Sequence, residues 1–289
     1  MTRIVSELLH ILEHPVLETL KMFPILFLTY LFMEWLEHAE DGKMTRFVYK
    51  SRRFGPLFGS VLGLVPQCGF SGAIASMYAT GAVTVGTLLA VLLTTSDEMI
   101  PMLLSANLSA HIILLILGIK FIIGIIVGFT TDLITRKRHL EKEQDIHAFC
   151  EREHCSCHDS IFLSALKHTF KILLIVFIIS VVLHFLVDHI PENTFKTILN
   201  FPVLSEFFAA LIGLVPNCAV SVLFTQLYLD GALEFGPMLC GLLSNGGLGL
   251  LVLYRANKGR KDCLIITLVL FISSLVLGSV AGFIFNGIL

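Results

Sequence analysis

The same six-residue motif occurs twice in this chain, each time inside a long apolar segment. GLVPQC occupies positions 63–68 and GLVPNC occupies positions 213–218, 150 positions later. Each copy places a helix-breaking proline, an amide side chain and a thiol in a row. Hydrophobic segments of membrane proteins normally avoid such a run, so its occurrence twice constrains the fold strongly.

The repeat extends far beyond the motif. The same ungapped shift of 150 positions aligns further identical residues: Lys21 with Lys171, Phe27 with Phe177, Ser71 with Ser221, Tyr78 with Tyr228, Gly86 with Gly236, and Gly128 with Gly278. Chance does not maintain one register over such a length. The sequence therefore predicts a duplicated unit of two halves.

Composition places the chain in a membrane. Of its 289 residues, 55% are hydrophobic and 15% are charged, with long runs almost free of charge. The net charge of -2 and the lack of a basic face argue against nucleic acid as a partner. Glutamates interrupt the apolar residues of positions 1–20, so we expect an interfacial amphipathic helix there instead of a cleaved signal.

Loop charges predict the orientation of the segments. Basic clusters at positions 43–53, 136–142 and 255–261 should lie in the cytoplasm. We therefore predict an all-α polytopic membrane protein with two repeats of inverted topology, at 21–135 and 161–289, joined by a cytoplasmic His/Cys-rich loop at 136–160. A bacterial-type inner membrane is the expected location, membrane lipid is the expected surrounding, and a homo-oligomer is compatible with the sequence.

Two segments of the first half contain polar interruptions. Residues 54–80 are interrupted at 66–69, and residues 83–104 at 94–98. The simplest arrangement is a re-entrant hairpin followed by one discontinuous helix, although two full crossings and a third short one also fit. Lipid cannot satisfy freed backbone groups, so broken helices or hairpins should meet near the midplane, enclosed by protein. Gly124 and Gly128 fit close helix packing.

The motif residues are the first candidate ligands. Cys68 and Cys218 would bring two thiols to one central site, where thiolates suit soft ions and metalloids. The alternative is that both cysteines are small packing residues. Pro66 and Pro216 free backbone carbonyls, and Gln67 and Asn217 either coordinate through their amide oxygens or cap the chain break.

Polar residues at the second interruption are the next candidates. Asp97 and Glu98 are ionisable groups within an apolar segment, which by default marks an ion path or proton relay. Thr94, Thr95 and Ser96 add oxygen ligands, and the second half supplies Ser244 and Asn245 at the corresponding positions. The alternative places Asp97 and Glu98 at a wet helix end.

The central loop carries a third group of candidates. Its potential metal ligands are His147, Cys150, His154, Cys155, Cys157 and His158. Such crowding favours a metal-delivering or sensing loop, although the spacing matches no standard zinc module. A linker without a specific role is the alternative.

The blocks at 63–98 and 213–247, joined by this loop, resemble the heavy-metal exporter family with ten membrane segments. That family is related to arsenical permeases and is also labelled a manganese transporter. The resemblance covers nearly the whole chain from the first apolar segment onward. It implies efflux of a metal or metalloid ion without deciding which ion.

Together these features predict a secondary transporter and not an enzyme. No P-loop is present, so an ion gradient, for example of protons, would drive transport without a resident cofactor. One alternative is a permease for a small organic solute. Another is a membrane thiol oxidoreductase using Cys68 and Cys218, which the absence of a Cys-x-x-Cys motif weakens.

Overall fold

The computed structural model describes residues 54–65, 68–79, 81–96, 99–106, 108–139, 204–257 and 259–285, with a few positions between 23 and 31 and between 162 and 178. Every regular element within these ranges is a helix. The predicted interfacial helix at 1–20 lies outside the described residues, as does nearly all of the predicted central loop.

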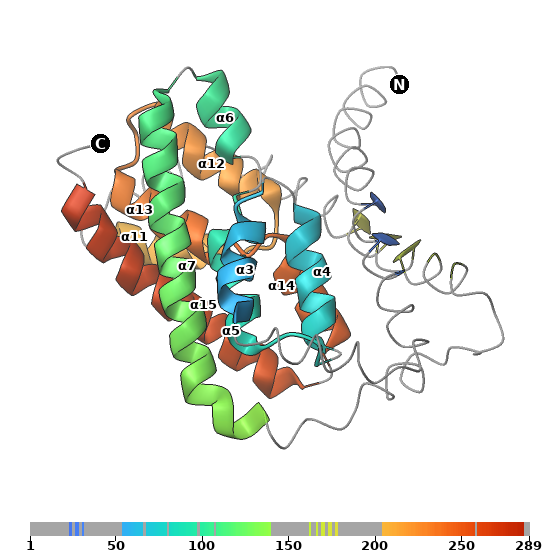
Figure 1. Ribbon diagram of the computed structural model, residues 1–289. Helices are drawn as coiled ribbons and strands as arrows, with labels where there is room; N and C mark the ends of the chain where they lie inside the picture. The colour runs from blue at the N-terminus through green and yellow to red at the C-terminus, as the bar shows by residue number, and fades with distance from the viewer. Residues whose placement is uncertain are drawn as a thin grey trace, which may run out of the picture.

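Two groups of helices make up the described structure (Figure 1). The first group is α3 (Gly55–Gly63), α4 (Cys68–Ala79), α5 (Val85–Thr94), α6 (Met99–Ser105) and α7 (Ala110–His139). The second group is α11 (Ser205–Gly213), α12 (Cys218–Leu229), α13 (Phe235–Ser244), α14 (Leu248–Ala256) and α15 (Arg260–Phe285). α7 thus continues through the basic residues 136–138 that were expected to begin the loop.

Helix lengths divide these elements into two kinds. Four stretches of the described chain are long and apolar enough to cross a membrane: Val85–Ser105, Ala110–Thr135, Phe235–Ala256 and Arg260–Phe285. In contrast, α3 has nine residues and α4 has twelve. At a rise of 1.5 Å per residue they reach about 14 and 18 Å, roughly half of the hydrocarbon thickness. Neither helix can cross alone.

The short helices α4 and α12 end in the same kind of turn. Gly81 has φ of +81° and Gly231 has φ of +68°, a conformation that L side chains rarely adopt. In the first turn, the N–H of Gly81 donates to the Tyr78 carbonyl and the N–H of Ala82 donates to the Met77 carbonyl, both at 2.9 Å. These two bonds form a Schellman motif, which satisfies the free carbonyls at the helix end.

Within each group, three helices pack tightly through small residues. α5 lies against α3 and α7, and α13 lies against α11 and α15. A Cβ on Gly128 would lie 2.7 Å from Cβ of Pro56 and 2.8 Å from the Gly86 carbonyl oxygen. A Cβ on Gly124 would lie 2.5 Å from Cγ2 of Thr94. The predicted close packing at Gly124 and Gly128 is therefore confirmed.

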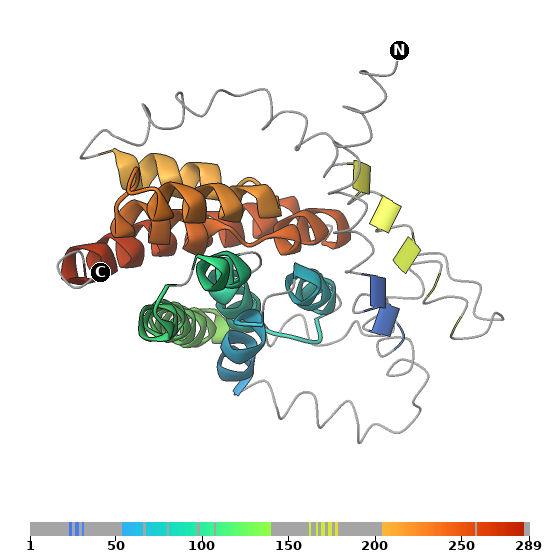
Figure 2. The ribbon, with the colours of Figure 1, turned by 90° about the horizontal axis from the view of Figure 1, so that it is seen from above.

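The two groups also pack against each other through their short helices. α14 packs on α4, and α6 packs on α12, so each group supplies a short helix to the other (Figure 1). At the first of these contacts, a Cβ on Gly249 would lie 2.8 Å from Cβ of Ser71. Seen from above, the two groups lie side by side, with α11, α13 and α15 on one side and α3 and α7 on the other (Figure 2).

Burial places α5 and α13 at the centre. Every residue of α13, and every residue of α5 from Gly86 to Thr94, is buried. α7 and α15 instead present large exposed apolar side chains along one side: Leu114, Ile122, Ile126 and Leu133 on α7, and Leu268, Ile272 and Val276 on α15. This distribution fits helices that face lipid and surround a protein-enclosed pair.

Candidate functional site

The end of α5 brings three predicted polar residues into the interior. Thr94, Thr95 and Ser96 are at most 6% exposed. Their hydroxyls donate to nearby main-chain carbonyls: Thr94 to Ala90 at 2.8 Å, Thr95 to Val91 at 2.7 Å, and Ser96 to Thr94 at 2.9 Å. Each hydroxyl oxygen keeps a free lone pair, so it can still accept a hydrogen bond or bind a cation.

The end of α13 has a similar polar character. Ser244 and Asn245 are buried, and the Ser244 hydroxyl donates to the Gly241 carbonyl at 3.0 Å. Asn245 uses both ends of its amide. Its Nδ2 donates to the Asn217 carbonyl at 3.4 Å, and its Oδ1 accepts from the N–H of Gly247 at 3.1 Å. Asn245 thus joins the end of α13 to the residues that precede α12.

Both copies of the sequence motif begin against these helix ends. A Cβ on Gly63 would collide with Oγ1 of Thr94 and lie 2.7 Å from the Val91 carbonyl oxygen. A Cβ on Gly213 would collide with Oγ of Ser244 and with the Gly241 carbonyl oxygen. The structure therefore brings the start of each motif to the polar residues of its own half, and it brings Asn217 to Asn245.

A buried lysine that the sequence analysis did not single out connects the two helix ends. Lys120, on α7, is 0% exposed. Its Nζ donates to the Thr95 carbonyl at 2.5 Å and to the Leu242 carbonyl at 3.3 Å. The signal was available, because Lys120 is a lone charge within an apolar run, the same pattern that singled out Asp97 and Glu98.

Asp132 is a second unpredicted residue, at the opposite end of α5. Its Oδ2 accepts from the Thr84 hydroxyl at 2.7 Å, and its Oδ1 accepts from the N–H of Gly86 at 2.8 Å. The carboxylate thereby satisfies a free donor of the first helical turn and complements the positive end of the helix dipole. Asp132 anchors α7 to the start of α5.

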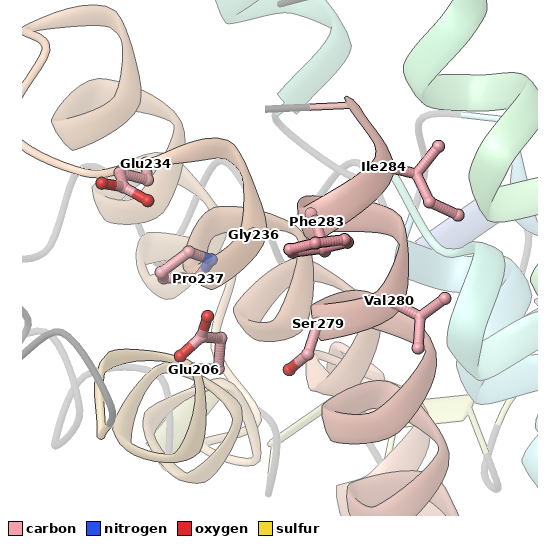
Figure 3. A pocket seen from close by; sticks show the side chains of 9 residues that line it. Glu206, Glu234, Gly236, Pro237, Ser279, Val280, Phe283 and Ile284 are labelled. Carbon is pink, nitrogen blue, oxygen red and sulfur yellow. The ribbon is translucent and has the colours of Figure 1, made fainter. Parts of the chain in front are cut away.

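At the corresponding position of the second half, the two helices α13 and α15 touch and a cavity lies beside the contact: a Cβ on Gly282 would collide with Cα of Gly236. The shift of 150 positions matches Asp132 with Gly282, and a cavity of about 530 Å³ borders Gly282 (Figure 3). Its lining also includes Glu206, Glu234, Gly236, Pro237, Ser279, Val280, Phe283 and Ile284. Because this cavity lies at the start of α13, it is separate from the polar residues at the other end of that helix.

The predicted metal ligands are not placed by the structure. Pro66, Gln67, Asp97, Glu98 and the six loop ligands lie outside the described residues, and the side chains of Cys68 and Cys218 do as well. Within the described part of the chain, no three His, Cys, Asp or Glu side chains form a group that could hold a metal ion. The thiol, carboxylate and loop sites remain predictions.

The comparison with protein families decides the class. The profile of a family described as "Putative, 10TM heavy-metal exporter" matches residues 22–196. The chain belongs to this family. It is therefore a multi-pass membrane protein of a transporter family, as the resemblance implied. No curated protein and no solved structure matches the chain.

Proposed function

We propose that this member of the exporter family is a secondary-active transporter that exports a metal or metalloid ion through a site between the ends of α5 and α13. One observation carries the proposal. The interior places Thr95, bonded to Lys120, and Asn245, bonded to Asn217, in a region that apolar side chains otherwise fill. Buried polar groups in a membrane protein are costly, and by default they mark a substrate path.

The ligands would come from both halves. Hydroxyl and amide oxygens of Thr94, Thr95, Ser96, Ser244, Asn245 and Asn217 supply neutral ligands in this proposal. Cys68 and Cys218, the first residues of α4 and α12, would add soft thiolates. Asp97 and Glu98 follow directly after Ser96 and would attract a cation or exchange protons. Pro66, Gln67 and Pro216 would shape the loops that carry these groups.

Alternating access would follow from two repeats of inverted topology. In this proposal α3 with α4, and α11 with α12, are re-entrant hairpins that enter from opposite sides, because their lengths reach only halfway through the membrane. α5 with α6, and α13 with α14, are the broken helices beside them. Movement of one half against the other would expose the site alternately to each side.

The remaining expectations complete the proposal. The loop at 136–160, with its cysteines and histidines, would capture the ion in the cytoplasm of a bacterial-type cell, and a proton gradient would drive export across the cell membrane. Cys240 and Cys263 are buried elsewhere, in α13 and α15. They are not candidates for capture.

The test is ion flux in proteoliposomes under an imposed proton gradient. Manganese, zinc, cadmium and arsenite would be compared for wild type, the double variant Cys68→Ser/Cys218→Ser, and Asp97→Asn. Cys263→Ser is the matched control, because its thiol donates to the main-chain carbonyls of Leu253 and Asn257, and a hydroxyl can donate there as well.

Each outcome assigns the chemistry of the site. Loss of soft-ion flux in the double cysteine variant, with the Cys263→Ser control intact, supports thiolate ligation. Flux of manganese alone, stopped by Asp97→Asn and not by the cysteine changes, supports an oxygen site. If no ion moves in any protein, export of a metal or metalloid ion is refuted and the organic-solute permease becomes the better hypothesis.

A further inference from the structure

Lys120 contacts main-chain oxygens at the ends of two different helices. The Thr95 carbonyl belongs to the residue that follows α5, and the Leu242 carbonyl lies in the last turn of α13. The lysine itself belongs to α7, so one side chain joins three helices and both groups. Because Lys120 is fully buried, bulk solvent does not reach its ammonium group.

Helix ends of this kind attract a cation. The last carbonyls of a helix have no partner within the helix, and they carry a partial negative charge of about half an elementary charge. Here two such ends approach the same point. In transporters with discontinuous helices, carbonyls at half-helix C-termini coordinate the coupling cation. The ammonium of Lys120 occupies the position that such a cation would take.

The lysine is supplied by one half alone. The shift of 150 positions places Leu270 of α15 at the position of Lys120, and Leu270 is also 0% exposed. Leu270 is therefore an apolar reference at a matched position, with the same burial and no charge. One cation is enough to contact both helix ends, because the Nζ of Lys120 donates to a carbonyl of each group.

We infer that Lys120 is a built-in cation that replaces a bound monovalent ion between the ends of α5 and α13. Wild-type protein consequently needs no sodium or potassium at this point. Truncating the side chain opens a site for a small monovalent cation, held by the Thr95 and Leu242 carbonyls. The role of this site in transport rests on the proposed function, whereas the site itself can be tested without transport.

The experiment measures thermal unfolding of the purified full chain in detergent. Wild type, Lys120→Ala and the matched control Leu270→Ala would be heated in chlorides of sodium, potassium, ethylammonium and N-methylglucamine at equal ionic strength. We expect saturable stabilisation of Lys120→Ala by at least one small cation over N-methylglucamine. An ion at ten times its dissociation constant shifts the folding equilibrium about elevenfold. Wild type and Leu270→Ala should show no such difference between cations.

Two further variants sharpen the result. Lys120→Arg keeps a cation and should be as insensitive to the added salt as wild type. Lys120→Met fills the space with an apolar chain, so it should be less stable than wild type without rescue by any cation. If Lys120→Ala cannot be purified in N-methylglucamine chloride, we expect monodisperse protein to be recovered when a small cation is present during extraction.

Three results would overturn the inference. The first is that neither the thermal stability of Lys120→Ala nor its yield of monodisperse protein changes with any of the small cations. The second is an equal response of Leu270→Ala, which would indicate a general salt effect. The third is an equal response of wild type, which would mean that the cation binds elsewhere. Since no flux is measured, failure here is distinguishable from failure of the proposed export.

Discussion

Replacing Gly124 with alanine tests the contact between α7 and the end of α5. The added Cβ would lie 2.5 Å from Cγ2 of Thr94 and 3.2 Å from the Ala90 carbonyl oxygen. Thr94 cannot simply rotate its methyl group away, because its hydroxyl donates to the Ala90 carbonyl. The helices must therefore separate or the hydrogen bond must break.

Gly118 offers a matched control on the same helix. A Cβ at Gly118 would have nothing within 4 Å, so Gly118→Ala gains only the better helix propensity of alanine, about 0.5–1 kcal/mol. Gly124→Ala makes the same gain but also overpacks the interface, which costs roughly 1–3 kcal/mol. The propensity cancels between the two variants. Their stabilities should therefore differ by about 1–3 kcal/mol, or roughly 5- to 150-fold in the folding equilibrium.

Thermal unfolding in detergent, measured as the monodisperse fraction after heating, gives the comparison. Gly118→Ala should match or exceed wild type, and Gly124→Ala should fall below it. Ion flux provides a second measurement, because a displaced end of α5 should lower flux in Gly124→Ala alone. A Gly124→Ala protein as stable as Gly118→Ala would show that the tight contact between α7 and α5 does not exist.

Three further changes have defined expectations. Asp132→Ala removes the acceptor of two hydrogen bonds and should cost about 1.5–3 kcal/mol in thermal unfolding, with a smaller loss for Asp132→Asn; equal stability of all three proteins would contradict the proposed anchor. Asn245→Ala should lower ion flux roughly tenfold or more. The control Asn257→Ala loses a similar hydrogen bond from the N–H of Gly259, far from the centre, and should retain ion flux. Equal flux in the two variants would exclude Asn245 from the site. Gly81→Ala, at φ of +81°, should cost about 1–2 kcal/mol of unfolding free energy and Gly81→Asn less, and an unchanged melting temperature for Gly81→Ala would refute the turn geometry.

Much of the architecture follows from local signals in the sequence. Apolar runs and scarce charge predict a helical membrane protein, and the family comparison and the helices agree. The polar runs beginning at Thr94 and Ser244 coincide with the last residues of α5 and α13. Such features are local, because hydroxyls and glycines act on the backbone within a few residues of their own positions.

Long-range partners were not predictable in the same way. Lys120 reaches a carbonyl 122 positions away, and Asp132 accepts from the N–H of Gly86, 46 positions earlier, in the first turn of α5. Both side chains lie on α7, and the hydrophobic pattern of α7 does not show which neighbouring helix a polar side chain contacts. The duplicated register did not help either, because Leu270 and Gly282 occupy the matching positions. The charged residues Lys120 and Asp132 occur in the first half only, so a comparison that looks for identical residues in the two halves does not find them.

The exchange of α6 and α14 between the two groups has a consequence for synthesis. α4 emerges from the ribosome long before α14, against which it packs, so it must wait in the membrane with that side uncovered. α6 likewise waits for α12. The first half therefore cannot complete its packing during its own insertion, because the helices that cover α4 and α6 belong to the second half. A chain truncated before α14 should accordingly be a target for membrane proteases.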